Sequence, residues 1–169
     1  QLFDAPSIEA QPDLPRLPDR GTVAEPWRQA KEDARFLREI IGVGSGAVKD
    51  RKLAELLGLT LKSIEDSAHS TRLKATIVGR VDDRRVKVTT RKRHPAARRF
   101  EMARLVGGCA DVMVRDDSSW FASTDAATAR QKYQRAFAAE FLCPIEPLKE
   151  MLDGDMAESA IEDAASEFA

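Results

Sequence analysis

The stretch of residues 98–109 constrains this chain most, because it reads as one helix with an apolar face that must be buried. Pro95 precedes this helix, and a basic run leads into it. The residues that recur at helical spacing are Phe100, Ala103, Val106 and Gly107, with Leu105 and Cys109 widening the face. A second long helix is predicted over residues 131–142 and ends before Pro144. The chain should therefore be built around two facing helices.

A β-hairpin is predicted ahead of the first of these helices. Residues 73–81 and 86–90 read as strands, in which Val86 and Val88 alternate with Lys87 and Thr89. The expected fold class is α+β, mostly helical, with core helices packed on a small antiparallel hairpin or sheet.

The chain is expected to form one domain, over residues 25–169, preceded by an arm. Residues 1–24 hold four prolines and few apolar side chains, so we expect an extended or mobile arm. The domain divides into a helical part over 25–70, the hairpin over 73–93 and the core helices over 96–169. Within the first part, two short helices around Gly58 superficially match a helix-turn-helix over residues 50–68.

Charge is close to balanced overall, with a net value of −1, but its distribution along the chain is uneven. Residues 84–99 contain no acid, and residues 146–169 contain eight acids and one base. The basic strip consists of Arg84, Arg85, Lys87, Arg91, Lys92, Arg93, Arg98 and Arg99. It suits either phosphate contacts or pairing with acidic groups of this chain or of a protein partner. Aromatic side chains are not interleaved with it, which disfavours single-stranded nucleic acid.

Two cysteines, Cys109 and Cys143, are too few for a disulfide scaffold in a chain of 169 residues. Together with His94 they match no known metal-finger spacing, so we predict no cofactor. No apolar run is long enough to span a membrane. We therefore expect a cytoplasmic protein with free thiols and no membrane contact.

Two segments resemble the ImmA/IrrE family of zincin-like metallopeptidases. The first is Arg99-Phe100-Glu101-Met102-Ala103, which is similar to the family's Arg-Phe-Thr-x-Ala run ahead of His-Glu-x-Gly-His. The second, over residues 135–144, is similar to the family's Asn-x-Phe-Ala-Ala-x-Leu-Leu-Met-Pro run. The resemblance implies a zincin-like pair of core helices.

The residues that would carry the family's catalysis are replaced in this chain. Arg104 stands where the resemblance places the first histidine ligand, Leu105 where it places the general base, and Gly108 where it places the second histidine. Residues 130–135, where a third ligand is expected, contain no acid. Zinc peptidases need two imidazoles at i and i+4 and a carboxylate that takes a proton from the bound water. We therefore predict neither catalytic nor metal-binding residues.

A buried arginine on the core helix needs a partner. Glu140, on the facing helix, is the acid that the sequence offers, and we predict an Arg104–Glu140 ion pair inside the former cleft.

Three functions follow from these observations. The first is a catalytically inactive peptidase-like domain that binds a protein partner, in the transcription-regulator, phage or stress contexts that the resemblance implies. The alternative is a DNA-associated regulator that uses residues 50–68 and the basic strip of residues 84–99. The third is an active zinc metallopeptidase, which the replaced residues disfavour.

Overall fold

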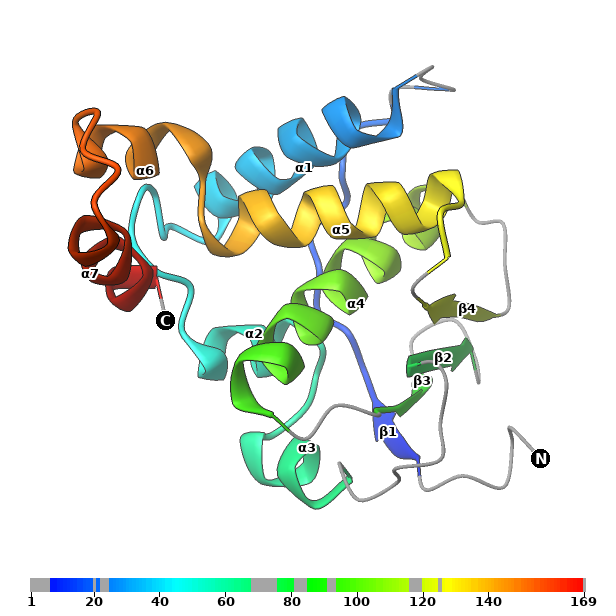
Figure 1. The fold of residues 1–169 in the computed structure, drawn as a ribbon. Coiled ribbons are helices and arrows are strands. Elements are labelled where there is room, and N and C mark those ends of the chain that lie inside the picture. Colours follow the sequence, from blue (N-terminus) through cyan, green and yellow to red (C-terminus); the bar gives the residue numbers. More distant parts are fainter. Residues whose placement is uncertain are drawn as a thin grey trace.

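The computed structural model describes residues 7–19, 21, 25–67, 76–80, 85–90, 94–115, 120–124 and 126–168, which form an α+β fold that is mostly helical (Figure 1). The helices are α1 (Pro26–Ile40), α2 (Asp50–Leu56), α3 (Leu61–Ser67), α4 (Pro95–Arg115), α5 (Ala129–Leu142), α6 (Ile145–Leu152) and α7 (Glu158–Phe168). The strands are β1 (Ile8–Ala10), β2 (Thr76–Arg80), β3 (Val86–Thr89) and β4 (Trp120–Ser123). This fold class confirms the prediction. Among the described helices, none has both the length and the apolar character that crossing a bilayer requires.

The strands form one antiparallel sheet in the order β1-β3-β2-β4. The central pair is the predicted hairpin, with Val78 opposite Val88. The two outer strands were not predicted. β1 joins the edge of β3, and β4 joins the edge of β2, where Thr76 lies opposite Ser123.

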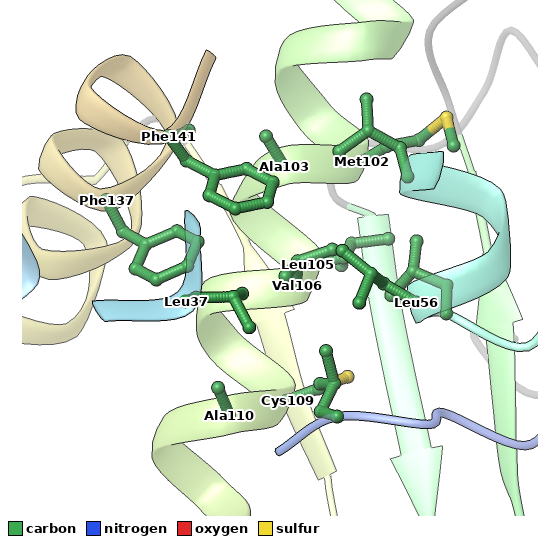
Figure 2. Packing of buried hydrophobic residues seen from close by; sticks show 14 of the residues in the cluster. Leu37, Leu56, Met102, Ala103, Leu105, Val106, Cys109, Ala110, Phe137 and Phe141 are labelled. Atoms are coloured by element: carbon green, nitrogen blue, oxygen red, sulfur yellow. The ribbon is translucent and has the colours of Figure 1, made fainter. Parts of the chain in front are cut away.

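Helix α4 lies in the middle of the molecule and is buried on every side through residues 101–110. Phe137 and Phe141 of α5 and Leu37 of α1 lie on one side of it, and Leu56 of α2 lies on the other (Figure 2). Apart from Glu101 and Arg104, the residues of this stretch are apolar or small, which suits a helix with no face toward water. The sequence predicted that this helix is buried against α5, but it did not predict that α2 covers the opposite face.

Helices α4 and α5 approach closely at Gly107. A Cβ atom on Gly107 would lie 2.6 Å from Cδ1 and 2.7 Å from Cγ of Phe137. The missing side chain therefore sets the separation of the two helices, and Phe137 fills the space with no exposed surface of its own.

Helices α1 and α5 lie side by side and run in the same direction (Figure 1). Tyr133 donates a hydrogen bond from its hydroxyl to Oδ2 of Asp33 at 2.9 Å. Nearer the C-terminal ends of both helices, Arg38 donates to the backbone oxygen of Phe141. The order of these contacts along both helices establishes the parallel arrangement.

The N-terminal segment, predicted as an extended or mobile arm over residues 1–24, is extended in its described residues 7–19 and packs into the folded body. In its described residues 7–19, Ala10, Leu14 and Leu17 are buried in the core. The backbone N–H of Asp13 donates to the backbone oxygen of Leu56 at 3.1 Å. Prolines exclude a helix here, but an extended chain can still pair at a sheet edge and bury apolar side chains.

Helices α6 and α7 lie side by side at one end of the molecule (Figure 1). No residue of α6 is fully buried, and α7 buries only Ala164 and Phe168. Arg99 of α4 donates to the backbone oxygen of Phe168 at 3.1 Å. This contact ties the end of α7 to the central helix.

Candidate functional site

The residues at the positions where the resemblance places catalysis all lie in the buried part of α4. Arg104 is 4% exposed and donates from Nη2 to the backbone oxygen of Thr124 and to Oε1 of Gln131, both at 2.6 Å. Leu105 is 1% exposed, and Gly108 is buried as well. The three positions therefore belong to the packed interior.

The predicted Arg104–Glu140 ion pair is wrong. Arg104 reaches Gln131, in the first turn of α5, and Glu140 lies nine residues further along that helix, about 13 Å away along its axis. Glu140 instead accepts a hydrogen bond from Nε of Arg35 on α1, at 2.7 Å. The sequence identified the correct pair of helices but not their offset, which is set by packing between Gly107 and Phe137.

Gln131 connects α4, β4 and the start of α5. Its Oε1 accepts hydrogen bonds from Arg104 and from the backbone N–H of Thr124, and its Nε2 donates to the backbone oxygen of Ala122 at 2.5 Å. Its own N–H donates to Oγ1 of Thr128, the N-cap residue of α5. The side chain of Gln131 thus forms hydrogen bonds with polar groups that would otherwise be buried without partners at this turn.

Gln134, one turn further along α5, has the opposite character. It is fully buried, and neither atom of its side-chain amide has a hydrogen-bond partner among the described residues. A buried amide in this state costs about 1–3 kcal/mol relative to a satisfied one. Sequence reasoning did not identify it, because a lone glutamine on a helix carries no signal of its environment.

The residues at the positions where the resemblance places the metal do not fit zinc. Arg104 brings a fixed positive charge, Leu105 has no proton acceptor and Gly108 has no side chain. Burial raises the pKa of the nearby Cys109 to about 12, which keeps it a thiol, whereas a metal binds the thiolate. No group of three or more His, Cys, Asp or Glu side chains suited to a metal occurs within the described part of the chain.

Another buried polar residue, which the sequence did not indicate, lies near the end of α1. Arg38 is 3% exposed and donates from Nε and Nη2 to the backbone oxygen of Gly44, at 3.0 and 2.7 Å, and also to that of Gly46. Burial lowers the pKa of Arg38, and the charge of Glu140 opposes this shift. Burial likewise raises the pKa of Cys143, and the charge of Arg38 opposes that shift. Arg38 therefore holds the glycine-rich loop against α1 and has a structural role.

The basic strip divides into exposed and internal parts. On β3 and just before it, Lys87 is exposed and Arg85 is 54% exposed, with Nη1 3.9 Å from Oε2 of Glu9. Arg99 is only 11% exposed, because it binds Asp50 and the backbone oxygen of Val48. The other predicted contact residues, Arg84, Arg91, Lys92 and Arg93, lie outside the described residues.

The helix-turn-helix-like segment forms α2 and α3, joined at Gly58. Thr60 and Ser63 cap α3 reciprocally through their hydroxyls and backbone N–H groups. A Cβ on Gly58 would lie 2.0 Å from the backbone oxygen of Gln11. The N-terminal segment therefore covers the turn between the two helices.

Comparison of this chain with protein-family models, with curated proteins and with solved structures finds no match. The resemblance of residues 99–103 and 135–144 to the ImmA/IrrE family therefore stays a prediction from the sequence.

Proposed function

We propose that this chain is a peptidase-like domain of the ImmA/IrrE type that has lost catalysis and acts as a protein-binding, regulatory module. The observation that carries the proposal is the state of α4. Its residues 101–110 are buried, and Arg104 at the first ligand position is held by Thr124 and Gln131. A catalytic helix must present its ligands and base to a substrate, and this helix presents neither.

The order of the elements supports a zincin-like ancestry. The hairpin of β2 and β3 leads into α4, and a further edge strand, β4, leads into α5 against which α4 packs. This is the frame that the resemblance implies. Its packing residues are present and its chemical residues are replaced, so binding of a partner is the remaining role for the domain.

Metal content and peptide cleavage test the loss of catalysis. The chain, purified without chelators and then dialysed, should contain far less than one zinc per chain by elemental analysis. It should also leave a fluorogenic peptide library uncut with zinc added. One zinc per chain, removable by a chelator together with cleavage activity, would establish an active peptidase instead.

Binding is tested separately. We expect a protein partner to form a complex of fixed stoichiometry with the chain, measured by size-exclusion chromatography with light scattering, and to be recovered uncleaved. A partner that is cut, or the absence of any stoichiometric complex with proteins of the source cell, contradicts the binding role.

A DNA-associated role is the second candidate, favoured by the exposed cations Arg85 and Lys87. It predicts a mobility shift that weakens steeply with salt, because each phosphate contact releases counterions. The double variant Arg85→Ala/Lys87→Ala should reduce the salt slope by about two. A shift that is insensitive to salt, or one unchanged in that variant, removes this candidate.

A further inference from the structure

We propose that the tip formed by the end of α6, the start of α7 and their connection binds a basic, amphipathic helical segment of a protein partner. The tip is defined as residues 151–162. The proposal deepens the proposed function and rests on it, since it assigns a surface and a partner chemistry to a binding module.

The tip carries large apolar side chains that the described part of the chain leaves exposed. Met151 is 47% exposed, Met156 is 71% exposed and Ile161 is 44% exposed. They account for three of the seven exposed large hydrophobic residues found among the described residues, and the other four lie on α1, α3 and α4. Exposed apolar groups gathered in this way mark interaction surfaces, and methionine adapts to partners of varied shape.

Acidic residues alternate with these apolar side chains. Asp153, Asp155, Glu158 and Glu162 all lie within the tip and are exposed. None of the four forms an ion pair within the described part of the chain. Lys149, the one base in α6 and α7, pairs with Glu146, with Nζ 3.3 Å from Oε1.

The sign of this charge selects the occupant. Nucleic acid and anionic lipid surfaces are repelled by an acidic surface, whereas lysine and arginine side chains are attracted to it. Exposed apolar side chains interspersed with exposed acids therefore fit a segment that carries an apolar stripe with cations on either side. An amphipathic helix presents such a pattern in its simplest form.

The backbone of the tip is fixed before any partner arrives. Asp153 has a φ of 43° and Gly154 a φ of 81°, so two successive left-handed residues end α6. The N–H of Asp153 donates to the backbone oxygen of Lys149 at 3.0 Å, and that of Asp155 donates to Leu152 at 2.6 Å. A surface held in this way loses little conformational entropy on binding.

A second copy of the chain is the competing occupant. Exposed cations also stand beside exposed apolar side chains on α1 and α3, where Arg28 follows Trp27 and Lys62 follows Leu61. Self-association is therefore one of the outcomes that overturn the proposal.

The test uses a labelled model peptide and the full chain. The peptide has roughly 18 residues, leucine and lysine only, with leucines at the spacing of one helical face. We expect binding by fluorescence anisotropy at an ionic strength of about 0.15 M. A scrambled peptide of the same composition and a leucine–glutamate peptide should both bind at least about tenfold more weakly.

Three variants locate the binding site. Met156→Ser/Ile161→Ser keeps the charge and should weaken binding about tenfold, as expected when apolar burial is lost. Glu158→Lys/Glu162→Lys should weaken it similarly. The matched control Asp13→Lys/Glu65→Lys makes the same change in net charge at exposed residues of other elements, and should bind like the unchanged chain.

Several results overturn the proposal. They are equal binding of the scrambled peptide, equal weakening by the control variant, unchanged binding by both tip variants, or self-association that the tip variants abolish in sedimentation experiments. A natural partner that binds the tip variants normally also overturns it, but leaves the proposed function intact. Failure of the proposed function would appear independently, as zinc content and cleavage.

Discussion

At the scale of single residues, two buried glutamines on one helix have opposite effects on the fold. Gln131 holds Arg104, Thr124 and Ala122, whereas the amide of Gln134 has no partner among the described residues. We expect Gln134→Met to raise the free energy of unfolding by about 1–3 kcal/mol, because an unsatisfied amide is replaced by an apolar chain of similar length. Gln131→Met should lower it by a similar amount or more. Urea denaturation of both variants measures the difference, and equal effects of the two substitutions would contradict this account.

Cys109 makes stability depend on pH in the alkaline range. Burial raises its pKa from 9.0 to about 12 in the folded chain. Between these values the unfolded chain releases the thiol proton and the folded chain keeps it, so the unfolded state binds fewer protons and stability falls as pH rises. The contribution is complete below about pH 9 and is lost toward pH 12. Cys109→Ala should show a shallower fall than the unchanged chain in thermal melts across this range, and parallel curves would disprove the role of Cys109.

The residues whose neighbours follow from periodicity were predicted, and those whose neighbours depend on non-local packing were not. Phe137, Leu105 and Val106 are buried as their helical spacing indicates. The partners of Arg104 depend on where the β4–α5 turn passes α4, and the backbone oxygen of Thr124 has no sequence signature. A charged residue in a core helix predicts that a partner exists, but not which group supplies it.

At the scale of elements, the N-terminal segment and the α2–α3 turn depend on each other. Gly58 has a φ of 67° and lies against the backbone of Gln11, whereas Gly42 has a φ of 72° and open space around it. Alanine at either position meets the same cost of a left-handed backbone, about 1–2 kcal/mol. We expect Gly58→Ala to cost about 1–3 kcal/mol more than Gly42→Ala, because it also displaces residues 10–14. Denaturant unfolding compares them, and faster hydrogen exchange at Asp13 in Gly58→Ala alone would identify the cause.

Elements with a local signal were accessible from sequence, and the two edge strands were not. Helices α1, α4 and α5 carry several repeats of their apolar pattern, the short helices α2 and α3 are separated by a glycine, and β2 and β3 follow each other as a hairpin. β1 has three residues and β4 has four, and each is defined by a partner strand far away in the sequence. A strand as short as this cannot be recognised without a neighbouring partner in the sequence. The prolines near β1 excluded a helix and indicated an extended segment, but they gave no sign that Ala10, Leu14 and Leu17 enter the core.

At the scale of the whole molecule, burial and charge separate the interior from the surfaces that can bind. The positions at which the resemblance places catalysis are buried in α4, which packs against α2, α5 and β4. The acidic end, α6 and α7, lies apart from the exposed cations of β3 (Figure 1). The uneven charge of the sequence was therefore informative about the molecule. The basic strip as a whole does not form one binding surface, because Arg99 pairs with Asp50 and is mostly buried.

Arg99 joins three distant parts of the chain, and its loss should release α7 from the body. Its guanidinium binds Asp50 and the backbone oxygens of Val48 and Phe168. Arg99→Met keeps the apolar stem and leaves these acceptors without their donor, at a cost of about 2–4 kcal/mol. In this variant, hydrogen exchange should become faster along α7. Exchange in the middle of α4 should stay unchanged, because that part of the helix remains packed on both sides. Arg51→Met is the matched control, since its side chain is 85% exposed and pairs only with Glu55 within α2, so it should change stability by less than about 0.5 kcal/mol. If α7 exchanges equally slowly in both variants, Arg99 does not hold it, and the attachment of the acidic end depends on the burial of Ala164 and Phe168 alone.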